Sequence, residues 1–175
     1  MADLRIQDRL QPSLLDRLID DEPGQRSEGV ERRALSRAQL RAAVLRDLGW
    51  LFNATRAEPG AESERADERA QWAQCPQARR SVLNYGLPAL AGGTVSSVDI
   101  GTMRAAVLEA LRAYEPRIAA DTLQVEVRTD AGQQRNTVQI TIKGRLWSQP
   151  VPLELLLAAD VDVETGSTRV RDLRN

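Results

Sequence analysis

Two kinds of hydrophobic spacing divide the chain at about residue 115. Before this point, apolar residues recur at intervals of three and four, and after it they alternate with polar residues. The first spacing places side chains along one face of an α-helix, and the second along one face of a β-strand. The pattern therefore predicts helices in the first part of the chain and a sheet in the last part.

The clearest predicted helix runs from about residue 37 to residue 53. Ser36 and Gln39 form a capping box at its start, and an apolar stripe follows at helical spacing: Leu40, Val44, Leu45, Leu48, Leu51 and Phe52. Arg33, Arg37, Arg41 and Arg46 occupy its other face. Without interleaved aromatic residues, we interpret these arginines as a solvated face and not as a phosphate-binding stripe.

A second amphipathic helix precedes residue 115. Its apolar stripe consists of Met103, Ala106, Val107, Ala110, Leu111 and Tyr114, and the candidate N-caps are Ser96, Ser97 and Asp99.

Between the two helices, residues 56–70 are charged and predict a surface loop that ends in a short helix near Trp72. Pro76 suits a first helical turn.

A short helix is also predicted near the N-terminus. Ser13 and Asp16 form the aspartate version of the capping box, and Leu14, Leu15 and Leu18 supply an apolar face. We expect residues 1–30 to form an arm and residues 31–175 a single domain. The leucines predict that the arm docks either on its own core or on another subunit.

Four segments in the last part of the chain predict strands. Residues 123–128 and 138–142 alternate regularly, and the odd positions of residues 151–163, ending in Val161 and Val163, stay apolar. The long segment fits either one bent strand or two strands with a bulge. Residues 168–173, charged at Arg169 and Arg171, predict an edge strand. The fold class is α+β, with helices packed on one side of a small, mostly antiparallel sheet.

An acid and a base flank a proline where the helical part meets the sheet. Pro116 should end the helix near Tyr114 and push Glu115 towards an extended backbone. A buried charge needs a partner, and Arg117 offers a fork of donors to a carboxylate. The residues alone favour Glu115 and Arg117 bracing their own fold, with a contact to another chain as the alternative.

Composition removes several classes of function. The chain has 25 acidic and 24 basic residues, no histidine and one cysteine, so we expect no nucleic-acid partner, no metal and no cofactor. Cys75, with no histidine to activate it, is expected to be a small packed side chain. No segment has the roughly 20 apolar residues that span a bilayer, which predicts no direct membrane insertion.

Five stretches resemble the TssE family of type VI secretion baseplate subunits, which is related to the tail-lysozyme-like wedge protein of contractile phage baseplates. They are PSLLDRLIDDEP from Pro12, VLRDLGWLFNA from Val44, RRSVLNYGLP from Arg79, YEPRI from Tyr114 and the terminal LLAADVDVETGSTRV. All five occur in order over nearly the whole chain, which makes the resemblance specific.

The resemblance implies a structural, non-enzymatic baseplate subunit at the cytoplasmic face of the inner membrane. Its implied partners are TssF and TssG in the wedge, TssK nearby, and the TssB–TssC sheath, which the sheet would anchor. Glu115, Pro116 and Arg117 match the family's EPR motif, which implies a role in assembly. Further interface candidates are the arm and sheet residues Leu14, Leu15, Leu18, Val161, Val163, Arg169 and Arg171.

The alternative function is that of a glycoside hydrolase acting on peptidoglycan. That chemistry needs one protonated and one ionised carboxylate across a cleft. Glu109 and Glu115 are available, but Glu109 lies off the apolar stripe and Glu115 has Arg117 close by to keep it ionised. Since aromatic residues that could stack on sugars are scarce, we favour the structural role and expect no catalytic residue.

Overall fold

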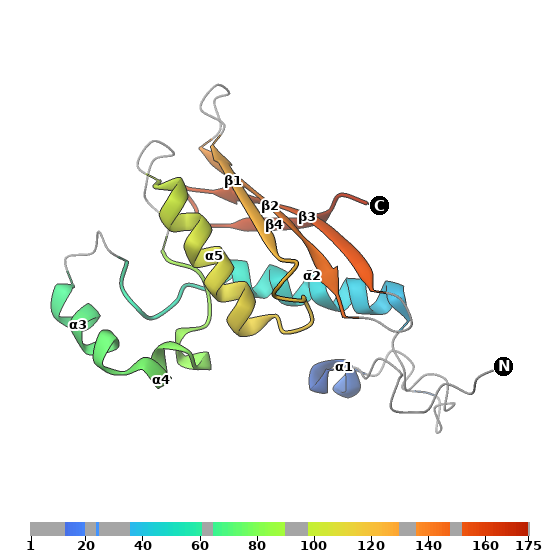
Figure 1. Ribbon diagram of the computed structural model, residues 1–175, viewed down its shortest axis with the longest axis horizontal. Coiled ribbons are helices and arrows are strands. Elements are labelled where there is room, and N and C mark those ends of the chain that lie inside the picture. The colour runs from blue at the N-terminus through green and yellow to red at the C-terminus, as the bar shows by residue number, and fades with distance from the viewer. Residues whose placement is uncertain are drawn as a thin grey trace.

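A computed structural model describes residues 13–19, 24, 36–60, 65–89, 98–129, 136–147 and 152–174. In these ranges the helices precede the strands, and this separation is typical of an α+β fold (Figure 1). The helices are α1 (Leu14–Leu18), α2 (Arg37–Asn53), α3 (Ala66–Gln74), α4 (Pro76–Arg79), the 3₁₀ turn η3 (Val82–Asn84) and α5 (Ile100–Tyr114). The strands are β1 (Gln124–Thr129), β2 (Thr137–Leu146), β3 (Leu153–Asp162) and β4 (Thr168–Asp172).

The four strands form one antiparallel sheet in the order β1-β2-β3-β4. The predicted strands are confirmed, and the long apolar segment is one unbroken strand, β3, paired along its whole length with β2. One row of the sheet, from β1 to β4, aligns Val125, Ile142, Leu157 and Asp172. The strands β1 and β4 are therefore the two edges.

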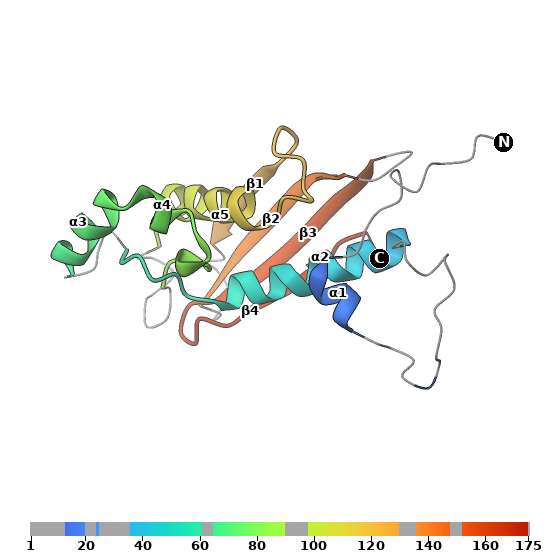
Figure 2. The ribbon, with the colours of Figure 1, turned by 90° about the horizontal axis from the view of Figure 1, so that it is seen from below.

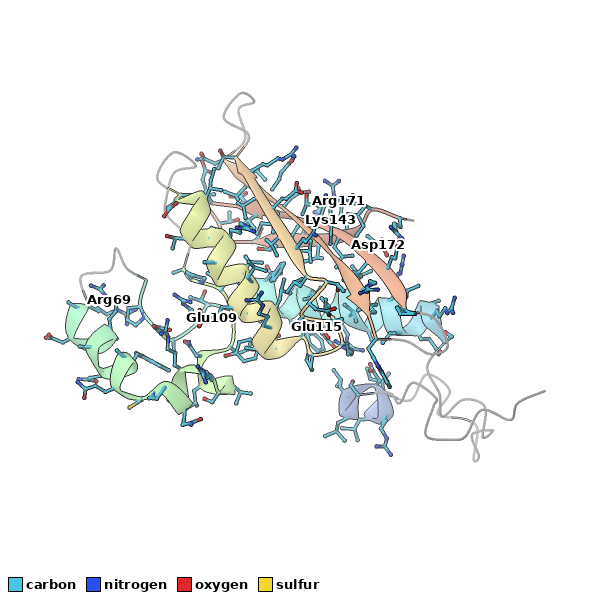
Figure 3. All side chains as sticks on the ribbon, in the orientation of Figure 1. Arg69, Glu109, Glu115, Lys143, Arg171 and Asp172 are labelled. Carbon is cyan, nitrogen blue, oxygen red and sulfur yellow. The ribbon has the colours of Figure 1, made fainter. Side chains whose placement is uncertain are left out.

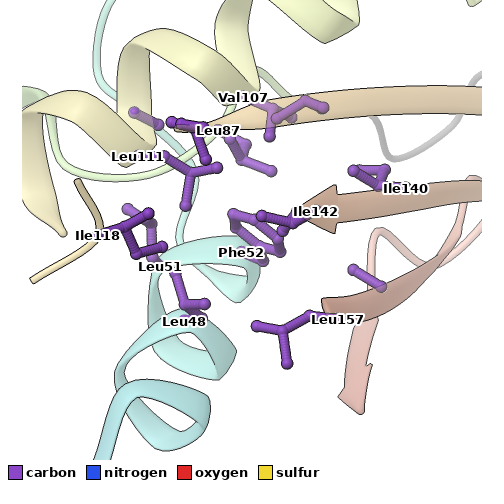
Figure 4. Packing of buried hydrophobic residues seen from close by; sticks show 14 of the residues in the cluster. Leu48, Leu51, Phe52, Leu87, Val107, Leu111, Ile118, Ile140, Ile142 and Leu157 are labelled. Carbon is purple, nitrogen blue, oxygen red and sulfur yellow. The ribbon is translucent and has the colours of Figure 1, made fainter. Parts of the chain in front are cut away.

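The helices α2 and α5 form a layer on one face of the sheet, as predicted. In Figures 1 and 2, α5 lies over the side of the sheet that carries β1, while α2 lies along the side that carries β4. The apolar stripes of both helices meet the inward residues of the strands in a single core (Figure 4). Its most deeply buried members include Leu48, Leu51, Val107, Leu111, Ile140, Ile142 and Leu157.

Local capping fixes the helix boundaries that the spacing predicted. The Ser13 and Ser36 hydroxyls both complete capping boxes, at α1 and α2. At α5, the Asp99 carboxylate accepts from the backbone N–H of Gly101 at 2.9 Å, so Asp99 is the N-cap among the three candidates. The helix ends at Tyr114, as Pro116 requires.

The helices α3 and α4 extend away from the sheet (Figure 2), and neither has a buried residue. The segment that follows them is bound to the end of α2. Leu87 pairs with Thr55, and Gly86, at φ +121°, passes so close that a β-carbon would lie 2.4 Å from the carbonyl oxygen of Ala54. The glycine is therefore required both by its backbone angle and by the close approach.

The predicted packing of Cys75 is wrong, and two of the interface candidates, Val161 and Val163, are buried. Cys75 is exposed and not packed, since α3 and α4 contribute nothing to the core. Val161 and Val163 are 1% and 0% exposed, because the odd positions of this segment face the helix layer. Their side chains belong to the core of the free chain.

The helix layer also contains no membrane-spanning segment. Among the described residues, none of the helices combines the length and the hydropathy that crossing a bilayer requires.

Candidate assembly site

Glu115 is the first residue after α5 and one of the most deeply buried charged groups of the described residues. Its backbone N–H donates to the carbonyl of Leu111 at 2.9 Å and closes the last helical turn. Its side chain is 2% exposed, whereas the neighbouring Pro116 is exposed. The tripeptide thus turns a carboxylate inwards at the end of the helix, where Figure 3 labels it.

Arg117 supplies the partner that this buried carboxylate needs. Its Nε donates to one oxygen of Glu115 at 2.6 Å and its Nη2 to the other at 2.5 Å. This is the bidentate geometry that suits a guanidinium and a carboxylate. The Arg117 carbonyl accepts from the N–H of Trp147 at 2.8 Å, which holds the tripeptide beside the end of β2. Glu115 and Arg117 therefore brace their own fold, as the sequence favoured.

The ion pair extends into α2 and from there to α1. Arg117 Nη2 donates to Asp47 at 2.6 Å, the other oxygen of Asp47 accepts from Arg46 at 2.9 Å, and Arg46 pairs with Asp16 at 2.7 Å. Five charges of alternating sign thus connect three elements: Glu115, Arg117, Asp47, Arg46 and Asp16. We call this set the junction network.

The pKa shifts of Arg117 and Asp16 both favour the charged form of the side chain. Burial by itself lowers the pKa of Arg117, but its hydrogen bonds to Glu115 and Asp47 outweigh this effect and raise the pKa above the ordinary value. For Asp16, burial raises the pKa, and the hydrogen bonds from Ser13 and Arg46 more than reverse this, so that the pKa is lowered. Burial raises the pKa of Tyr85, and the nearby negative charges of Asp47 and Glu115 raise it further.

Large apolar side chains lie exposed beside the junction network. Trp50 is 52% exposed, with the Arg46 guanidinium 5.3 Å from its ring centre, and Trp147 is 59% exposed. On α1, Leu14 and Leu18 are each more than 70% exposed, while Leu15 is less so. Exposed tryptophan and arginine side chains are the types that dominate binding energy at protein interfaces.

The structure brings together only some of the predicted site residues. Glu115 and Arg117 join α1 through the junction network. Arg169 and Arg171 lie instead on the exposed face of β4, where Arg171 pairs with Asp160 at 2.9 Å.

Sequence reasoning missed Asp47 and the role of Arg46. The solvated-face interpretation is wrong for Arg46 and for Arg41, which binds Asp172 at 2.9 Å, since both side chains are largely covered by their partners. Arg37 is exposed as expected, and Arg33 lies outside the described residues. The adjacent Arg46 and Asp47 were a visible charge pair, but spacing does not reveal which distant charges they meet.

The two glutamates of the hydrolase alternative lie in different surroundings (Figure 3). Glu109 is 58% exposed and lies 3.9 Å from Arg56. Glu115 is buried, with both oxygens occupied by Arg117. A general acid must contact the substrate to which it delivers a proton, whereas both oxygens of Glu115 accept hydrogen bonds within the fold. Of these two glutamates, only Glu109 exposes its carboxylate to solvent.

The described residues also contain no cluster of three or more acidic or cysteine side chains that could hold a metal ion. The arrangement around Glu115 is thus one of charge pairing and exposed apolar side chains.

A family model described as baseplate wedge protein gp25 matches residues 38–151, more than half of the chain, from α2 to the segment before β3. Neither the curated proteins nor the solved structures contain a match. The family agrees with the resemblance to TssE, and its members are structural. The chain belongs to the family of the baseplate wedge protein gp25, and its role is that of a structural baseplate component of a contractile tail.

Proposed function

We propose that the protein is the TssE-type subunit of a type VI secretion baseplate, without catalytic activity. In this proposal it assembles with TssF and TssG near TssK, at the cytoplasmic face of the inner membrane, and anchors the first TssB–TssC ring of the sheath. Residues 1–30 act as an arm of the wedge-like domain formed by residues 31–175. The observation that carries the proposal is the family match over both packed helices and the first two strands.

The junction network and its surroundings are the proposed contact with the wedge subunits. Nη1 of Arg117 is buried and has no hydrogen-bond partner among the described residues. An unpaired buried N–H is costly, and a carbonyl or carboxylate from another chain would satisfy it. The exposed Trp50 and Trp147 would supply apolar contact area beside it.

The sheet is the proposed contact with the sheath. A partner's extended segment would pair with an edge strand through backbone hydrogen bonds, and its alternate side chains would set the register. The strands β1 and β4 are the available edges.

The test of the wedge contact is co-purification with TssF and TssG. Replacing Arg117 alone would leave Glu115 buried and unpaired, so the informative variant combines Arg117→Ala with Glu115→Gln, which removes both charges. Arg65→Ala, at the exposed arginine that precedes α3, is the matched control. Circular dichroism and thermal melting verify that each variant is folded.

We expect the folded double variant to lose the complex and Arg65→Ala to keep it. If the double variant co-purifies like the wild type, Glu115 and Arg117 serve only the internal fold, and the wedge contact lies elsewhere. If the wild type itself binds neither TssF nor TssG, the proposed assignment to this baseplate is wrong.

A further inference from the structure

Arg56, which follows the end of α2, is a largely buried arginine with incomplete pairing. Its side chain is 16% exposed, and its Nε is buried and has no hydrogen-bond partner among the described residues. The carboxylate that it pairs with in this part of the chain is that of Glu109, at 3.9 Å, which is too long for a hydrogen bond. Because a buried N–H without an acceptor is costly, the site favours a further acceptor.

The second glutamate of this region does not supply that acceptor. One oxygen of Glu58 accepts from Nε of Arg79 at 2.9 Å and from Nδ2 of Asn84 at 3.2 Å. These contacts connect the end of α4 to the segment after α2 and leave the guanidinium of Arg56 with only the long contact to Glu109 among the described residues.

Tyr114 and the backbone of Arg56 place this guanidinium beside η3. The Tyr114 hydroxyl donates to the carbonyl of Ser81, the cap of η3, at 2.8 Å. Burial raises the pKa of Tyr114, the negative charge of Glu109 raises it further, and the positive charge of Arg56 opposes both. The N–H of Arg56 donates to the carbonyl of Leu87 at 2.9 Å. In Figure 3, Glu109 lies on the side of α5 turned towards α3 and α4.

The turn η3 holds two aliphatic side chains in water on a fixed support. Val82 and Leu83 are 79% and 69% exposed. The N–H of Leu83 donates to Oγ of Ser81 at 3.2 Å, and the Asn84 side chain, 6% exposed, accepts from the N–H of Glu58 at 2.9 Å. A partner would therefore bind these aliphatic side chains without having to order the turn first.

The charges around η3 are complementary to an acidic segment. Arg80 ends α4 directly before η3, and Arg112 lies three residues after Glu109, on the same side of α5. Both arginines are exposed. The region thus combines four arginines with two glutamates: Arg56, Arg79, Arg80 and Arg112 with Glu58 and Glu109. This surplus of positive charge attracts a carboxylate.

We propose that Arg56, Val82 and Leu83 bind a peptide segment of a partner protein in which a carboxylate lies beside aliphatic side chains. We call these three residues the η3 surface. The carboxylate binds Arg56, and the aliphatic side chains pack on Val82 and Leu83. A phosphate ion would satisfy the arginine but leave the aliphatic pair in water, so the chemistry favours a peptide. The inference goes beyond the proposed function, in which TssF and TssG bind at the junction network and the sheath at the sheet.

Selection from a peptide library tests the surface. The probe is a phage-displayed library of random short peptides, selected on the complete chain and counter-selected on the double variant Val82→Ser with Leu83→Ser. Because both side chains are exposed, this variant should fold, which circular dichroism verifies. We expect the enriched peptides to combine aliphatic residues with an aspartate or glutamate. Enriched peptides without an acidic residue, or no enrichment over the counter-selection, would overturn the proposal.

A double-mutant cycle tests the contact with Arg56. Fluorescence anisotropy measures the binding of one enriched peptide, in its acidic form and with the acid replaced by the amide, to the wild type and to Arg56→Gln. We expect each change alone to weaken binding about tenfold and both together by little more, because they remove the same ion pair. Effects that multiply would overturn the role of Arg56.

The matched control is Arg145→Gln, since Arg145 has an ion pair of similar length, 3.8 Å to Asp121, at the end of β2. This variant should bind the peptide like the wild type. If Arg56→Gln fails to fold, the amide form of the peptide tests the same contact on the wild type, and unchanged binding of that form contradicts the proposal.

Sedimentation of the free chain distinguishes another protein from a second copy as the occupant. We expect a monomer at the concentrations of the binding assay. A dimer that the Val82→Ser and Leu83→Ser variant abolishes would show that a second copy covers the η3 surface, and would overturn the proposal. Co-purification with TssF and TssG is a separate measurement, so a failure here leaves the proposed function intact.

Discussion

At the scale of single residues, burial changes what Arg117 can be expected to do. An arginine at an exposed junction could be replaced by alanine without loss of the fold. The carboxylate that Arg117 binds is 2% exposed and has no other charged partner among the described residues. Removing one member of such a pair is costly because the other charge stays buried.

We therefore predict that Arg117→Ala lowers the free energy of unfolding by about 3–5 kcal/mol. The double variant Arg117→Ala with Glu115→Gln should lose clearly less, since no charge remains to be desolvated. Urea unfolding of both variants measures the difference. A single variant that is as stable as the wild type would show that Glu115 finds another partner.

Two glycines should respond to substitution by alanine in opposite directions. Gly86 has φ +121°, and an added β-carbon would lie 2.4 Å from Ala54, so Gly86→Ala should cost at least about 2 kcal/mol. Gly49 lies within α2 with nothing within 4 Å of an added β-carbon, so Gly49→Ala should stabilise the protein by about 0.5–1 kcal/mol. Thermal melting tests both, and equal shifts would contradict the structure of the Gly86 turn.

At the scale of elements, α1 is attached to the body by charge and not by packing. It has no buried residue, and the salt bridge from Asp16 to Arg46 connects it to α2. Because the same Arg46 also binds Asp47, the attachment of α1 depends on the arrangement of the junction network.

This attachment should depend on pH. The pKa of Asp16 is lowered in the folded protein from 3.8, so its contribution to stability is complete above pH 3.8 and is lost as the pH falls through the lower folded value. The stability difference between the wild type and Asp16→Asn should follow this course. It is measured from urea unfolding at a series of pH values, and a difference that persists in strong acid would contradict the role of the Asp16 carboxylate.

At the scale of the whole molecule, two exposed apolar surfaces lie on separate parts of the fold. One is formed by Leu14 and Leu18 of α1, and the other by Val82 and Leu83 of η3. All four side chains are more than two-thirds exposed, so neither pair contributes much to the stability of the free subunit.

We predict that Leu14→Ser combined with Leu18→Ser changes the free energy of unfolding by less than about 0.5 kcal/mol but weakens co-purification with TssF and TssG. Val82→Ser combined with Leu83→Ser is the matched control and should bind normally. The opposite result, with binding lost only in the control, would place the wedge contact on the segment after α4 instead of on the arm.

Much of this protein is determined by short-range sequence. The apolar spacing gives the bounds of α2, and the capping residues Ser13 and Ser36 lie within three residues of the groups that they bind. Pro116 ends α5, and alternation gives the strands and their inward faces. These features depend on local sterics and on which side of an element is apolar, both of which can be read from neighbouring residues.

Only the tertiary structure decided which distant groups meet. Asp47 binds Arg117 across 70 residues, and Asn53 binds Thr168 across 115. No local pattern distinguishes these polar residues from others on the same helix, because their partners are chosen by how the helix layer lies across the sheet. The bracing of Glu115, the attachment of α1 and the pairing of Asn53 with Thr168 all follow from that packing.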